Sequence, residues 1–242
     1  MNKSISHQTI QIVVLIPAAG IGSRMKSPCP KQYIKVAGKT IIEHSISTFL
    51  KQPRISKIIV SLNKDDIIFN KLIISKNRII KTVIGGNNRA DSVLTGLNYL
   101  SENLELDSCW VLIHDAVRPC LHQDDLNKII YFIDNHQSSY GGILAAPVRD
   151  AMKYSLKGKI DINHTTEKNK LWYALTPQFF PLSLIKNCLT QALSEKAVIT
   201  DEASALEYCG YNPQLLDGRI DNLKVTQPED LMLVEFYLSR IL

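Results

Sequence analysis

The sequence lacks the features that mark several large classes of protein. No uninterrupted apolar run approaches the length of a membrane span, and no apolar segment of the signal-peptide type opens the chain. The lysines are scattered, no dense basic run occurs, and the formal net charge is only +5. We therefore expect a soluble, cytoplasmic protein that binds neither nucleic acid nor a membrane.

Paired cysteines are also lacking. The five cysteines form no C-x-x-C motif and are odd in number, so reduced thiols in a cytosolic protein are the simplest interpretation. Cys109, His114, Cys120 and His122 lie close together and raise the alternative of a zinc site. The apolar run 111–113 between them is typical of a buried strand, which would scatter these side chains. We do not expect zinc there.

Length and hydrophobic periodicity indicate an α/β protein. The 242 residues, 45% of them hydrophobic, suit one large domain or one domain with a small appendage. Two histidines are predicted to be structural: His44 on the polar face of its helix, and His114 at the end of a strand. Core strands are predicted at 12–16, 55–62, 78–84, 110–113, 141–148, 175–181 and 217–225, and helices at 40–50, from 65, 93–100, 124–133, 182–193, from 200 and from 226.

The loop after the first predicted strand consists mainly of small residues. Such residues let backbone N–H groups approach a ligand closely, as in phosphate-binding loops. The loop has no P-loop pattern, and Met25 stands where the dinucleotide fingerprint has its third glycine. A tight αβ connection is the plainer alternative, but the nearby Arg24 and Lys31 favour a polyphosphate site. The small residues are Ala18, Ala19, Gly20 and Gly22.

A second loop contains a glycine pair, Gly85-Gly86, and leads into the predicted helix 93–100. The pair permits positive φ, and the following helix N-terminus offers N–H groups and a positive dipole end. This loop would hold the base or ribose of a nucleotide. The alternative is a turn capped by Asp91 or Ser92.

Asp115 and Arg118 follow the predicted strand 110–113. Ligands of open α/β sheets bind beyond the carboxyl ends of the strands. There, an aspartate can hold Mg²⁺ directly or through water, and an arginine can bind phosphate through two hydrogen bonds. A purely structural ion pair is the alternative. Lys224 is expected at the carboxyl end of the last predicted strand, beside the same site.

Residues 149–173 are polar and alternate only weakly, so they can contribute little to a core. We predict a projecting β-arm, which would pack on a partner chain because a lone hairpin is only marginally stable. The chain is thus divided into a core, 1–148 and 174–242, and an arm, 149–173, that packs on a partner chain.

Eight motifs occur in order along nearly the whole chain: Pro17-Ala-Ala-Gly-x-Gly-x-Arg-Met25, Pro30-Lys-Gln-Tyr33, Arg89-Ala-Asp-Ser-Val93, His114-Asp-Ala-x-Arg-Pro119, Ala146-Pro-Val-Arg-Asp150, Leu175-Thr-Pro-Gln178, Thr200-Asp-Glu-Ala-Ser204 and Lys224-Val-Thr-x-Pro-Glu-Asp230. As a set they closely resemble the 2-C-methyl-D-erythritol 4-phosphate cytidylyltransferase family of the non-mevalonate isoprenoid pathway. The resemblance implies a three-layer, Rossmann-like nucleotidyltransferase core with a mixed, mainly parallel sheet. It also implies attack of the substrate phosphate on the α-phosphorus of CTP, with Mg²⁺ or another divalent cation as cofactor.

The resemblance implies site residues in three groups. Arg24, Lys31 and Lys224 would be catalytic and contact the triphosphate. The methylerythritol phosphate side would involve Asp115, which is also near Mg²⁺, with Arg118, Thr176, Thr200, Ala151 and Lys168. CTP would be bound by Pro17, Ala18, Ala19, Gly20, Gly22, Gly86, Asn87, Arg89, Ser92 and Ala116.

Three positions depart from the family pattern. Ser23 stands where arginine is frequent, and in the arm Ala151 and Lys168 stand where threonine and arginine commonly reach the partner's pocket. We expect a weaker grip on the methylerythritol phosphate and no loss of the reaction, since Lys168 offers a point charge in place of a fork.

Four other functions compete with this interpretation. The acceptor could be another polyol phosphate, such as ribitol 5-phosphate, or the reaction could be that of a sugar-phosphate uridylyltransferase. A catalytically silent dimeric binding module is disfavoured because Lys31, Asp115, Arg118 and Lys224 are all present. An NAD-dependent dehydrogenase is disfavoured by the missing third glycine.

Overall fold

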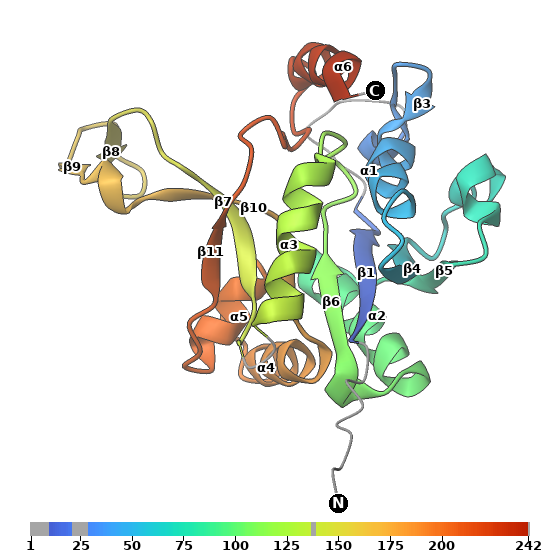
Figure 1. The fold of residues 1–242 in the computed structure, drawn as a ribbon. Helices are drawn as coiled ribbons and strands as arrows, with labels where there is room; N and C mark the ends of the chain where they lie inside the picture. Colours follow the sequence, from blue (N-terminus) through green and yellow to red (C-terminus); the bar gives the residue numbers. More distant parts are fainter. Residues whose placement is uncertain (1–9, 21–28, 137–138, 242) are drawn as a thin grey trace, which may run out of the picture.

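A computed structural model describes residues 10–20, 29–136 and 139–241. Seven strands form one sheet, and β10 runs antiparallel to both of its neighbours while the other pairs are parallel. The mixed, mainly parallel sheet expected from the family resemblance is confirmed (Figure 1). In spatial order the strands are β11 (Gln214–Asp217), β7 (Gly142–Pro147), β10 (Trp172–Pro181), β6 (Cys109–Ile113), β1 (Gln11–Ala18), β4 (Ile55–Leu62) and β5 (Ile80–Ile84).

Helices cover both faces of this sheet, because its central strands are apolar on both sides. All five residues from Ile12 to Ile16 in β1 have no exposed surface. The even-numbered ones pack with α1 (Ile41–Leu50) and α3 (Gln123–Asn135). Val13 and Leu15 pack on the other face, with α2 (Arg89–Asn103), α4 (Leu182–Ser194) and α5 (Glu202–Tyr208). A continuous apolar run is what a strand buried on both faces requires.

The carboxyl-terminal segment differs from the prediction. The expected strand 217–225 is wrong, because β11 ends at Asp217 and the chain then turns across the end of the sheet. The buried Asn222 holds these turns, donating from Nδ2 to the Thr176 carbonyl at 2.6 Å. Helix α6 (Asp230–Ile241) begins at Asp230 and not at 226, since that carboxylate accepts hydrogen bonds from the N–H groups of Thr226 and Gln227.

Two other predicted helix starts are corrected. Asp201, and not Thr200, caps α5, in a capping box with Ser204. No α-helix starts at Asp65-Asp66; one Asp66 oxygen instead accepts from the N–H groups of Ile68 and Phe69, at the start of the short 3₁₀ turn η3 (Phe69–Lys71).

His44 is not on an exposed face of α1, as its position in the sequence suggested. It is 5% exposed, and its Nε2 lies 2.8 Å from the Val36 carbonyl. The small hairpin of β2 (Lys35–Val36) and β3 (Lys39–Thr40) covers this side of α1. The hydrophobic periodicity of one helix carries no information about that cover.

Residues 149–173 contain the hairpin β8 (Met152–Tyr154) and β9 (His164–Thr166), followed by the 3₁₀ turn η6 (Lys168–Lys170). The hairpin projects from the core sheet at the ends of β7 and β10 (Figure 1). It exposes apolar side chains, with Ile160 98% and Ile162 63% exposed. Among the described residues, no helix has the length and apolar character needed to cross a membrane.

Candidate active site

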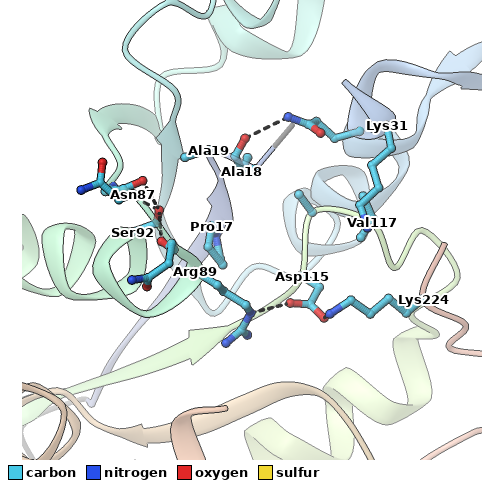
Figure 2. A pocket seen from close by; sticks show the side chains of 15 residues that line it. Pro17, Ala18, Ala19, Lys31, Asn87, Arg89, Ser92, Asp115, Val117 and Lys224 are labelled. Carbon is cyan, nitrogen blue, oxygen red and sulfur yellow. Dashed lines mark hydrogen bonds and ion pairs between the residues drawn. The ribbon is translucent and has the colours of Figure 1, made fainter. Parts of the chain in front are cut away.

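One pocket collects segments that are far apart in the sequence at the carboxyl ends of the central strands (Figure 2). The end of β1, the loop before α2, the loop after β6 and the 3₁₀ turn η2 (Lys31–Tyr33) all contribute to it. Its position is the one expected for a ligand site in an open α/β sheet. The lining residues are Pro17, Ala18, Ala19, Gly20, Lys31, Gln32, Gly86, Asn87, Asn88, Arg89, Ser92, Asp115, Ala116, Val117 and Lys224.

Asp115 is the electrostatic centre of this pocket. Its carboxylate accepts from Arg89 Nε at 3.0 Å and Lys224 Nζ at 2.9 Å (Figure 2). Arg118 Nε lies 3.4 Å from the same carboxylate. Burial alone would raise the pKa of Asp115, but these three cations hold it well below its usual range. The carboxylate is therefore ionised at any pH at which the protein works, and it positions three cations.

Arg89 is held from two sides. Its other two nitrogens bind the buried Glu202 of α5 at 2.6 and 3.0 Å, so the guanidinium bridges Glu202 and Asp115. Burial disfavours the charge of Arg89, yet the two carboxylates raise its pKa above the ordinary value. Arg89 therefore fixes the start of α2 to the end of β6 and lines the pocket through the rest of its side chain.

Arg118 and Thr176 are buried beside Asp115. Arg118 donates from one terminal nitrogen to the Asn222 carbonyl at 2.7 Å, which ties the loop carrying Lys224 to β6. Thr176 Oγ1 accepts from the Asp115 N–H at 3.2 Å. In this arrangement both residues shape the wall that carries Asp115, so the structural role considered for the Asp115–Arg118 pair is present.

His114 is fully buried in the same wall, and its hydrogen bonds define its tautomer. Its Nε2 faces the Arg118 carbonyl at 3.0 Å and must donate, which leaves Nδ1 to accept from the Thr176 hydroxyl at 2.9 Å. Burial lowers the pKa of His114 to about 4. The neutral imidazole is a structural group, as expected from its position at a strand end.

Replacing His114 by glutamine is expected to make the free energy of unfolding fall less steeply as the pH is lowered. Between pH 6.5 and 4.5 the unfolded chain takes up a proton on this histidine and the folded chain does not, so the wild type loses up to about 1.4 kcal/mol of unfolding free energy per pH unit. We expect the stability gap between wild type and His114→Gln to shrink as pH falls. Urea unfolding at several pH values measures it, with His164→Gln on the exposed arm as control; a constant gap would contradict the assignment.

Lys31 and Lys224 approach the pocket from two further segments. Lys31 Nζ donates to the Val225 carbonyl at 3.1 Å, and the Val225 N–H donates to the Val117 carbonyl at 2.9 Å. These bonds connect η2, the loop after β6 and the segment before α6. Lys31 and Lys224 therefore line one pocket, although Lys224 reaches it from a turn and not from the end of a strand.

The glycine pair before α2 is needed for packing and not for positive φ. Neither glycine has positive φ. A Cβ on Gly86 would lie 2.2 Å from the Asp91 Cβ, and one on Gly85 would lie 2.7 Å from the Ala19 Cβ. The Gly86 N–H donates to Ser92 Oγ at 3.1 Å, so Ser92 fastens the loop; the helix cap is Asn88, and neither Asp91 nor Ser92.

The remaining predicted site residues lie elsewhere. Gly22, Ser23 and Arg24 lie outside the described residues. Thr200 lines a separate cavity on the other side of Arg89, together with Asp201. Ala151 and Lys168 are exposed on the arm, where Lys168 Nζ donates to the Arg149 carbonyl at 3.0 Å.

Sequence reasoning missed several residues of the site. Gln32 lines the pocket from η2, and Asn88 and Val117 line it beside residues that were expected there. Glu202, the second partner of Arg89, is also absent from the predicted site residues. The motif Thr200-Asp-Glu-Ala-Ser204 contains it, but nothing in the linear pattern indicates its distant partner Arg89.

A mainly parallel sheet with a cation-rich pocket at the carboxyl ends of its strands defines an α/β protein of the nucleotidyltransferase type. The family model described as IspD, 2-C-methyl-D-erythritol 4-phosphate cytidylyltransferase, matches residues 12–240. The chain therefore belongs to the 2-C-methyl-D-erythritol 4-phosphate cytidylyltransferase family.

Individual relatives agree with this membership. The enzyme of this name from Photorhabdus laumondii subsp. laumondii is 56% identical over 243 residues, covering 99% of this chain and 100% of its own. Its counterpart from Salmonella paratyphi B is 52% identical over 231 residues, with 96% and 95% covered. The crystal structure of the Francisella tularensis enzyme superposes with a TM-score of 0.80 at 32% identity, covering 94% and 99%.

Proposed function

We propose that the chain joins CTP and 2-C-methyl-D-erythritol 4-phosphate in isoprenoid precursor biosynthesis. An oxygen of the substrate phosphate attacks the α-phosphorus of CTP, and the bond from that phosphorus to the bridging oxygen of the β-phosphate breaks. Pyrophosphate leaves, and the product is 4-diphosphocytidyl-2-C-methyl-D-erythritol. Membership of the family supports this reaction.

The observation that carries the proposal is the cluster of cations around one pocket wall. Lys31 and Lys224 line the same pocket as the backbone of Ala18, Ala19 and Gly20. A phosphate monoester is largely dianionic at pH 7, so its attack needs no general base. The enzyme has to position two polyanions and stabilise the charge that develops at the α-phosphorus, which fixed cations and N–H groups do. Arg24 would add a third cation to the triphosphate side.

The other site residues would divide between the two substrates. Gly86, Asn87, Ser92, Pro17 and Ala116 line the pocket where the nucleoside of CTP would lie. Asp115 would orient Lys224 toward the phosphates, with Arg118 and Thr176 supporting it on the methylerythritol side. CTP would also be contacted by Arg89 and Gly22, and the methylerythritol phosphate by Thr200.

Mg²⁺ fits this donor set as an ion carried by the nucleotide. Among the described residues no group of three or more ligating side chains forms a protein cage for a metal. Asp115 accepts from three cations and so retains about one lone-pair position for a further partner. Mg²⁺ commonly uses one carboxylate together with substrate phosphates and water. When bound, it would neutralise charge on the triphosphate.

Pyrophosphate release from CTP tests the proposal. We expect turnover with methylerythritol 4-phosphate, none with ribitol 5-phosphate, and loss of turnover when EDTA removes the divalent cation. Preference for ribitol 5-phosphate would keep the chemistry and change the substrate. Silence with both acceptors in the presence of Mg²⁺ would overturn the proposed function.

We also propose that the arm, residues 149–173, pairs two chains into a homodimer. Its exposed apolar side chains need cover, and the arm projects from the core sheet at the ends of β7 and β10 (Figure 1). Ala151 and Lys168 would then act in the partner's pocket. Sedimentation of the full chain and of a chain with a shortened arm measures the association.

Restoring the family's usual residues in the arm is expected to tighten substrate binding. Ala151→Thr adds a hydroxyl donor, and Lys168→Arg replaces a point charge by a planar fork that binds phosphate through two hydrogen bonds. We expect the KM for methylerythritol 4-phosphate to fall several-fold in each variant, with the KM for CTP unchanged. Steady-state kinetics measures both constants, and an unchanged or higher KM for methylerythritol 4-phosphate in both variants would contradict the prediction.

A further inference from the structure

Two side-chain amides hold the carbonyl groups of the first pocket loop. Gln32 Nε2 donates to the Ala18 carbonyl at 2.9 Å, and Asn63 Nδ2 donates to the Ala19 carbonyl at 3.4 Å. The orientation of the Asn63 amide is set by a third bond, because its Oδ1 accepts from the Asp65 N–H at 3.0 Å. Gln32 is 4% exposed, so its amide has little water to bind in place of the Ala18 carbonyl.

The geometry of η2 explains how one short turn serves this purpose. A 3₁₀ turn has three residues per turn, so three successive side chains point in three directions. Lys31 lines the pocket, Gln32 reaches the Ala18 carbonyl, and the Tyr33 hydroxyl donates to Asp66 at 2.5 Å. Tyr33 thereby anchors the turn to the loop that follows β4, and that loop also carries Asn63.

Gln32 and Asn63 both line a second cavity beside the loop. Ala19, Gly20 and Gln32 line both this cavity and the main pocket, whereas Asn63 lines the second cavity. In a trans peptide the C=O of one residue and the N–H of the next point in opposite directions. Because Gln32 and Asn63 hold the carbonyls of Ala18 and Ala19, the N–H groups of Ala19 and Gly20 are fixed so that each points away from the amide that holds its peptide. Successive N–H groups on one side form a concave anion site.

We infer that Gln32, supported by Asn63, is a positioning residue for the triphosphate of CTP, acting through the backbone N–H groups of Ala19 and Gly20. This inference rests on the proposed function, since it names what prepares the nucleotide loop for that substrate. Gln32 touches no reacting atom. Its effect is on the affinity for the nucleotide and not on the affinity for the acceptor.

Gln32→Met tests the inference, because it keeps the length of the side chain and removes its donor. We expect the dissociation constant and the KM for CTP to rise about five- to tenfold, the loss typical of one hydrogen bond, with the KM for methylerythritol 4-phosphate unchanged. The matched control is Gln52→Met. Gln52 is also buried, and its Nε2 donates to Asn127 Oδ1 at 2.9 Å on an element that does not line the pocket.

If Gln32 has a purely structural role, both glutamine variants lose the same thermal stability and CTP binding does not change. That result would overturn the inference. A parallel rise of both KM values in Gln32→Met would overturn it as well. Asn63→Leu, at a partly exposed position, is expected to weaken CTP binding in the same direction and decides the question if Gln32→Met does not fold. If the wild type itself does not bind CTP, the proposed function is overturned. If the wild type binds CTP and Gln32→Met binds it equally well, only the positioning role of Gln32 is overturned.

Discussion

Replacing Lys31 by alanine is expected to lower turnover by about a thousandfold or more. Lys31 lines the same pocket as Ala18, Ala19 and Gly20, where a fixed cation would stabilise charge that develops at the α-phosphorus. The fold is expected to survive, because the partners of Gln32 and Tyr33 hold η2 in place. Pyrophosphate release at saturating concentrations of both substrates measures the loss.

Lys39→Ala provides the control for this experiment. Lys39 is an exposed lysine of the adjacent hairpin strand β3, so its removal changes the net charge of the protein equally without altering the pocket. We expect near-normal turnover in that variant. Near-normal turnover in well-folded Lys31→Ala would refute the catalytic assignment of Lys31.

Asp115→Asn is expected to lower the free energy of unfolding by about 3–5 kcal/mol, the usual result of removing one partner from a buried ion pair. Asp115 is 6% exposed, and Arg89, Arg118 and Lys224 would face a neutral amide in its place. Because the three cations depress the pKa of Asp115 below its unfolded value, its contribution is fully present above the unfolded pKa and is lost only as pH falls through the depressed one. The deficit should therefore be constant between pH 5.5 and 8.

Asp134→Asn is the matched control for this second experiment. Asp134 accepts two hydrogen bonds from Arg54, at 2.6 and 2.9 Å, but both side chains are about a third or more exposed. An exposed pair of this kind contributes under about 1 kcal/mol. Urea unfolding compares the two variants, and equal small losses would show that Asp115 is not the electrostatic centre of the site.

The sequence alone predicted most of the sheet and the main features of the pocket. Continuous apolar runs such as Ile12–Ile16 identify strands buried on both faces, and the turns that follow them mark the edge where ligands bind. The family motifs named the pocket residues Ala18, Lys31, Asp115 and Lys224, which the fold brings together. These features are local, or they depend on one rule of sheet topology, so a linear pattern is enough.

Tertiary structure decided the features that depend on contacts between distant segments. Glu202 meets Arg89 across 113 positions of the sequence, and Asn222 fixes the turn that carries Lys224 against Thr176. The strand predicted at 217–225 does not form, because the bond from Asn222 to Thr176 favours turns in this segment. His44 is buried because a hairpin outside its helix covers it.

The same distinction holds within the first pocket loop. Its small residues predicted a close approach of backbone to phosphate, and this follows from side-chain size alone. The direction of its carbonyl groups is set by Gln32 and Asn63, which stand 14 and 44 positions away from the residues they bind. The sequence determined that backbone N–H groups can reach a ligand here, and only the packed structure decided which way they point, because peptide orientation is fixed by partners that the chain brings near through folding.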